Sequence, residues 1–271
     1  MKTIKHIVII SAVLLIVCSA YSQNTGRSGT KSSGNKMINK DQASNRLDKD
    51  AVLINPGKSD ISRISQIGQD NYVRKLKESG KRYSSIIKQY NSSGNNKALQ
   101  SGRHGTSGYL FIEQFGNNNQ ARQNIYERNN AVTRQYGNGN RANIQVQQGR
   151  DNDAVIIQSD DNNKAWIQQQ NNGHNAIINQ YEGDNKAFIN QNGSDNMIQI
   201  DQSGSSLLKI DQKGSKNIIR GYRSSWAESL NGSVLDIEQY GSYNQIDVSQ
   251  SNSKAKLQQR GAYNKSLIIQ K

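Results

Sequence analysis

Amide side chains at a fixed spacing are the residues of this chain best placed to do chemistry together. Glutamine, glycine and asparagine recur as Gln-x-Gly-x-x-Asn in eight copies, which begin at Gln66, Gln114, Gln135, Gln147, Gln191, Gln212, Gln239 and Gln259. A carboxamide carries two donors and an acceptor, so stacked copies can hydrogen-bond to one another. The spacing therefore predicts hydrogen bonding between repeats.

The glutamine and asparagine positions of these copies, with those of related copies that lack the glycine, form the predicted amide ladder. Its members are Gln66, Asn71, Gln114, Asn119, Gln135, Asn140, Gln147, Asn152, Gln158, Asn163, Gln169, Gln180, Asn185, Gln191, Asn196, Gln202, Gln212, Asn217, Gln239, Asn244, Gln250, Gln259 and Asn264. The glycines two residues after a ladder glutamine are expected in turns, where φ > 0 is needed. They are Gly68, Gly116, Gly137, Gly149, Gly193, Gly204, Gly214, Gly241 and Gly261.

The elements that must position these side chains follow from the period. From Gln147 to Gln212 the glutamines are spaced by 11, 11, 11, 11, 11 and 10 residues. Eleven residues hold one strand and a tight turn, so two such units form a rung of about 22 residues. Internal repeats of this length indicate a solenoid. We expect an all-β fold, a β-solenoid of stacked strand-turn-strand rungs.

Alternation within one rung shows how a narrow core could form. In Ala187–Gln191, residues 187, 189 and 191 share one face, and in Asn196–Gln202, residues 196, 198, 200 and 202 do. A rung by itself buries too few apolar side chains to offset the entropy of ordering its backbone. Stability must come from neighbouring rungs.

The repeats resemble those of the curlins, the secreted subunits of curli amyloid fibres, whose unit is Gln-x-Gly-x-x-Asn-x-Ala-x-x-x-Gln. Gln147–Gln158 matches the unit throughout, the copies from Gln191 and Gln239 carry isoleucine at the alanine position, and those from Gln158 and Gln180 carry an acid at the glycine position. The resemblance implies export through an outer-membrane secretion channel with accessory factors, amyloid-like polymerisation with other curlin subunits, and roles in biofilm matrix and cell adhesion.

Within that family the chain is more similar to the minor, nucleating subunit than to the major one. The nucleator tends to carry a basic terminal repeat, and the last repeat here contains Arg260, Lys265 and Lys271. The chain is longer than the family's usual five repeats.

Three segments follow from composition. Residues 1–22 carry a basic start, an apolar run and small residues, as a signal peptide does, and indicate a secreted, cell-surface protein. Residues 23–60 are rich in Ser, Gly, Asn and Lys and are expected to be a flexible leader. Residues 61–271 are the expected solenoid, and proline, which interrupts sheets, is absent from them.

The charge balance bears on partners. Lys and Arg number 35 against 21 Asp and Glu, a net charge of +14. Such a balance suits an anionic cell surface or polysaccharide, or serves solubility during export. The basic residues are scattered rather than grouped with aromatics, so no specific nucleic-acid site is expected.

No set of residues predicts catalysis, a metal site or a cofactor. His104 and His174 stand alone in Gly- or Asn-rich turns, and the acidic residues are placed as solvated turn residues. We expect no enzyme. Two other interpretations stay open: a monomeric β-solenoid adhesin, which would need capped ends, and a β-helix polysaccharide lyase or hydrolase, which would need longer loops and a groove of converging carboxylates.

Overall fold

The computed structural model describes residues 36–40, 46–47, 61–68, 70–77, 83–91, 94–103, 108–220, 227–230, 232–251 and 254–270. Every regular element in these ranges is a β-strand. They contain no helix of the length and hydropathy that a membrane crossing requires. The expected signal peptide, 1–22, lies outside the described residues.

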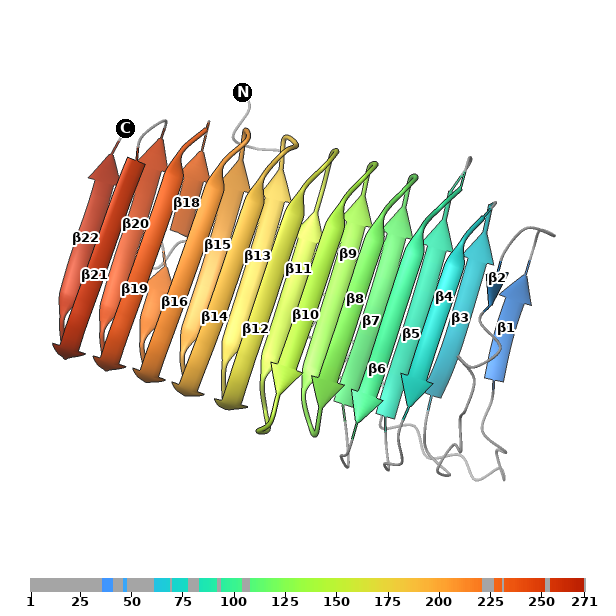
Figure 1. Ribbon diagram of the computed structural model, residues 1–271, viewed down its shortest axis with the longest axis horizontal. Helices are drawn as coiled ribbons and strands as arrows, with labels where there is room; N and C mark the ends of the chain where they lie inside the picture. Colours follow the sequence, from blue (N-terminus) through green and yellow to red (C-terminus); the bar gives the residue numbers. More distant parts are fainter. Residues whose placement is uncertain are drawn as a thin grey trace, which may run out of the picture. The chain divides into compact units, whose positions relative to one another are not determined.

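The strands form two parallel sheets, and successive strands alternate between them except at β17 and β18, which both belong to one sheet (Figure 1). Sheet A contains β1 (Lys36–Lys40), β3 (Ile61–Ile67), β5 (Tyr83–Tyr90), β7 (Gly108–Phe115), β9 (Asn130–Tyr136), β11 (Asp153–Gln158), β13 (Asn175–Tyr181), β15 (Met197–Ser203), β17 (Ile218–Arg220), β18 (Ala227–Leu230), β20 (Gln245–Ser251) and β22 (Lys265–Gln270). Sheet B contains β2 (Arg46–Leu47), β4 (Tyr72–Lys77), β6 (Lys97–Arg103), β8 (Gln120–Tyr126), β10 (Arg141–Gln147), β12 (Lys164–Asn172), β14 (Lys186–Ser194), β16 (Leu207–Ser215), β19 (Val234–Ser242) and β21 (Lys254–Ala262).

Equivalent residues of successive rungs lie opposite each other. In sheet A, Ala154 pairs with Ala176 and Gln158 with Gln180; in sheet B, Gln169 pairs with Gln191. Each of these pairs joins residues 22 positions apart, the spacing that the repeats predict. The all-β solenoid of stacked rungs expected from the sequence is therefore confirmed.

The core is the thin space between the inward faces of the two sheets. Strand alternation places alanine, isoleucine and glutamine inward in turn, as at Ala187, Ile189 and Gln191, which are at most 1% exposed. Ile198 and Ile200 close the core from β15 and are equally buried. Their burial confirms the faces expected for this rung. A one-residue slip in the register would instead turn every apolar side chain outward.

A polar cluster interrupts the core in the N-terminal half. Lys75, Gln100 and Gln123 occupy the sheet B position that Ile144 takes in the next rung. Gln100 accepts a hydrogen bond from the Ser85 hydroxyl at 2.7 Å and donates to Gln123 at 3.1 Å. The cluster accompanies a division of the buried apolar residues into two groups, of which the smaller contains Ile64, Val73, Ile87, Ala98, Ile112 and Ala121.

Two parts of the stack depart from the expected rungs, one in sheet A and one at the N-terminal end. The step from Gln212 to Gln239 is 27 residues, and here two short strands, β17 and β18, both pair with β15 and β20. The additional residues of this rung fall between these two strands. At the other end, β1 and β2 lie within the expected flexible leader, 23–60, and pair with β3 and β4; the rest of that segment lies outside the described residues.

Candidate assembly interface

The inward glutamines form two continuous ladders. In sheet A, Gln66, Gln89, Gln114, Gln135, Gln158, Gln180 and Gln202 are joined by Nε2–H···Oε1 bonds of 2.8–2.9 Å. In sheet B, Gln169, Gln191, Gln212, Gln239 and Gln259 are joined at 2.7–3.1 Å. Every bond runs from a glutamine to the one in the following rung. Each ladder therefore has a donor end and an acceptor end.

The second N–H of the amide crosses the core. Gln180 Nε2 donates to the carbonyl of Lys164 in the opposite sheet, and Gln158 does the same to Arg141, both at 3.0 Å. A ladder amide thus satisfies both its donors and its acceptor while fully buried. The ladders join the rungs to one another and the two sheets across the core.

The asparagines stack in the turns. The Asn217 side chain accepts a hydrogen bond from the Asn244 N–H at 3.1 Å. Its Nδ2 donates to the carbonyl of Gly241, in the next turn, at 3.0 Å. The equivalent bonds recur at Asn119, Asn196 and Asn244. The five-residue step from glutamine to asparagine therefore places one amide in the core and one in the turn.

The turn glycines are required for two reasons. All nine predicted turn glycines have positive φ. At Gly214, which has φ +111°, an added Cβ would also lie 1.8 Å from the carbonyl oxygen of Gly241. The backbones of successive turns stack too closely for a side chain.

His174 substitutes for an asparagine, a role that we did not expect. It is 1% exposed, its N–H donates to Asn152 Oδ1 at 2.8 Å, and its Nδ1 accepts the N–H of Asn196 at 3.4 Å. Nε2 lies 2.8 Å from the Gln170 carbonyl. Burial lowers the pKa of His174 below its ordinary value, because the charged ring would lose its water. The neutral ring is therefore a ladder member.

Gln147 is placed differently from its expected position. Ala142, Ile144 and Val146 point inward from β10, so Gln147 faces outward and Val146 takes the ladder position beside Gln169. The turn that follows is one residue longer than the turn from Gln180 to Asn185, which restores Asn152 to its ladder. In consequence Gln169 Oε1 is buried without a hydrogen-bond partner.

Other expected ladder residues lie as predicted, with one exception and several additions. Gln250 belongs to β20, but its side chain is outside the described part of the chain. Sequence reasoning missed Gln89, Asn96 and His174, which lack the full motif, and Gln100 with Gln123, which pair two positions before the usual glutamine. Gln89 follows Ile87 by two residues and so shares its inward face, a signal that could have revealed it.

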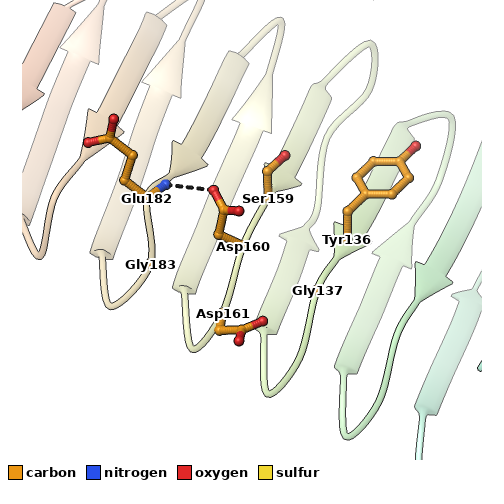
Figure 2. Close-up of a pocket in the computed structure, with 7 residues that line it drawn as sticks. All are labelled: Tyr136, Gly137, Ser159, Asp160, Asp161, Glu182 and Gly183. Atoms are coloured by element: carbon orange, nitrogen blue, oxygen red, sulfur yellow. Dashed lines mark hydrogen bonds between the residues drawn. The ribbon is translucent and has the colours of Figure 1, made fainter.

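A shallow hollow lies over the turns that follow sheet A strands. It is lined by Tyr136, Gly137, Ser159, Asp160, Asp161, Glu182 and Gly183 (Figure 2). Asp160 Oδ2 accepts the N–H of Glu182 at 3.0 Å, and Asp161 Oδ1 accepts that of Asn138 at 2.6 Å. These carboxylates bond the backbone of neighbouring turns. Among the described residues, no group of His, Cys, Asp and Glu is arranged to hold a metal ion.

Among the described residues, β21 and β22 form the last rung of the stack. Within the described residues, β21 pairs only with β19 and β22 only with β20, so their outer edges carry unpaired backbone groups. Ala255, Leu257 and Ile268 continue the inward rows but are only partly buried. An open edge beside an incompletely covered core is a surface for pairing with another strand.

Comparisons with known proteins add no identification. No protein-family model, no curated protein and no solved structure matches this chain. The fold and its open rung therefore stand on the residues and geometry of the chain itself.

Proposed function

We propose that this chain is an exported structural subunit that assembles head to tail into curli-type amyloid fibres outside the bacterium. Such fibres would serve biofilm matrix and cell adhesion, with other curlin subunits and the secretion channel as partners. The observation that carries the proposal is the open last rung, in which β21 and β22 present unpaired edges over a partly exposed apolar row.

The polarity of the ladders supports head-to-tail contacts. Gln259 is the last glutamine of the sheet B ladder, and its Nε2 donates to Ser266 at 2.7 Å instead of to a further rung. The first glutamine of the sheet A ladder, Gln66, lies opposite Lys40 of β1, and its Oε1 is buried without a hydrogen-bond partner in the described residues. Every ladder bond runs in the same direction along the stack, so the two faces of a rung are unlike. An interface between unlike surfaces of identical subunits produces a filament when it does not close into a ring.

The charge of the last rung supports a role in starting fibres. Lys254, Lys256, Arg260 and Lys265 are all exposed on its outward faces. A basic rung of this kind can gather subunits of opposite charge before strands pair. Because of this basic rung and the resemblance of the repeats to those of curlins, we assign the chain to the nucleating subunits.

The test is growth of thioflavin-T fluorescence in the purified protein, alone and added in trace amounts to a major curlin-like subunit. We expect fluorescence to rise after a lag, and the product to diffract at about 4.7 Å. Removal of the partner's lag by a trace of this protein would support nucleation. A β-rich protein that stays monomeric for days would contradict the proposal and favour the monomeric adhesin.

A further inference from the structure

The outward face of sheet B carries cations without matching acids over part of its length, from β4 to β14. From β4 to β14 its exposed strand residues include six cations and, in the described residues, no carboxylate; the cations are Arg74, Lys97, Arg122, Arg141, Lys164 and Lys186. Sheet A differs, because its cations Lys88 and Arg134 each lie 3.7 Å from Glu113. Positive charge without matching acids therefore lies on the part of sheet B from β4 to β14.

Three of these cations form a straight row. Arg141 pairs with Lys164 and Lys164 with Lys186 in the in-register sheet, so their side chains succeed one another at about the 4.8 Å strand spacing. All three are exposed. Like charges directly opposite each other in a sheet are destabilising. A bound polyanion would remove that repulsion.

Two exposed aromatic residues adjoin the row. Trp166 and Phe188 lie opposite each other in β12 and β14, two residues from Lys164 and Lys186, and each is 43% exposed. Aromatic rings offer a large apolar surface on which the C–H face of a sugar ring can pack. The face thus joins a line of positive charge to an apolar platform.

From this arrangement we infer that the outward face of sheet B, centred on Arg141, Lys164, Lys186, Trp166 and Phe188, binds a linear carboxylated polysaccharide. A polyuronate carries one carboxylate on each sugar, so a single extended chain can follow a straight row of cations. The phosphates of a DNA duplex instead follow two helical strands and meet a flat face only at intervals. The choice of polysaccharide also rests on the extracellular location proposed above.

The experiment measures binding of fluorescein-labelled polygalacturonate to purified protein by fluorescence anisotropy. One variant carries Arg141→Gln, Lys164→Gln and Lys186→Gln. A control variant loses the same charge in the turns, through Arg128→Gln, Arg150→Gln and Lys216→Gln. Circular dichroism checks the fold of both, and thioflavin-T growth is followed separately, so loss of binding and loss of assembly are distinguished.

We expect the sheet B variant to bind at least about tenfold more weakly and the control to change by less than about threefold, because each exposed ionic contact contributes modestly. Methyl-esterified polygalacturonate, which has the same backbone without charge, should not bind. Equal weakening in both variants, or equal binding of the ester, would overturn the inference. Tighter binding of oligo-dT than of polygalacturonate would assign the face to single-stranded nucleic acid instead.

Discussion

Each ladder glutamine uses its amide in two directions, and this explains why no shorter or charged residue replaces it in most rungs. Gln180 accepts from Gln158, donates to Gln202 and donates across the core to the Lys164 carbonyl. Buried polar groups are stabilising only when all partners are present. Val146 shows the consequence of a missing member, since Gln169 Oε1 beside it has no partner.

His174 makes one ladder sensitive to pH. Burial lowers its pKa, so between its ordinary pKa of about 6.5 and the lowered value the unfolded chain binds more protons than the folded chain. The stability that depends on the neutral ring is thus complete above that ordinary value and is lost as the pH falls through the lowered one. Protonation would also remove the Nδ1 acceptor of the Asn196 N–H.

When the pH is lowered from 7.5 to 5.5, we therefore expect the urea midpoint of the wild type to fall more than that of the His174→Asn variant. The variant keeps an amide at this position but has no ring that titrates. Unfolding is followed by circular dichroism at both values. The carboxylates common to both proteins provide the background. An identical fall in the two proteins would contradict the role of His174.

At the scale of elements, the turns set the register of the strands. The glutamine-to-asparagine turn places Gly214 where its backbone contacts the next turn, and Asn217 joins the two turns by donating to the Gly241 carbonyl. A longer turn after β10 compensates for its different alternation. Turn length and strand alternation together keep successive rungs aligned.

Two glycines separate the effects of φ and of stacking. Gly214 and Gly261 have similar φ, +111° and +100°. A Cβ added at Gly214 would lie 1.8 Å from the Gly241 carbonyl oxygen, whereas a Cβ added at Gly261 would meet only Asn264 Nδ2, at 3.6 Å. Gly261→Ala should cost about 1–2 kcal/mol of unfolding free energy from backbone strain alone. Gly214→Ala should cost more, because a turn must also move.

Denaturant unfolding of the two variants measures this difference. Gly261→Ala should also slow fibre growth, because a further rung stacked on β21 would meet the new methyl group. Equal costs for the two substitutions, together with unchanged growth, would show that turn stacking is not the constraint.

At the scale of the whole solenoid, the two ends differ, so assembly should have a direction. Leu257 lies in the inward row of the last rung and is partly buried, whereas Leu267 in the same rung points outward and is 55% exposed. Burial of an unpaired ammonium group is costly. A lysine in place of Leu257 would thus oppose docking of another subunit, and a lysine in place of Leu267 would not.

Leu257→Lys should therefore stop growth when mixed in small amounts with wild-type protein, because it can join a fibre but cannot accept the next subunit. Leu267→Lys is the matched control and should leave the growth rate unchanged. Thioflavin-T kinetics at increasing variant fractions give the answer. Inhibition by neither variant, or by both equally, would contradict assembly through the last rung.

The sequence by itself determined the repeating rung, the alternation of its strands and most of the amide ladders. In a strand every second residue shares a face, so Ala187, Ile189 and Gln191 must point the same way, and the glycine two residues later must turn the chain. These are local consequences of residue type and spacing. They hold in any stack of such rungs.

Only the tertiary structure decided the outward position of Gln147, the ladder role of His174 and the joining of three cations into a row on sheet B. Each depends on which residue of a neighbouring rung lies opposite, and turns of unequal length change that pairing. The physical reason is that a hydrogen-bonded register is a contact between distant parts of the chain. Spacing along the chain indicates the face of a residue, and packing between rungs selects its partner.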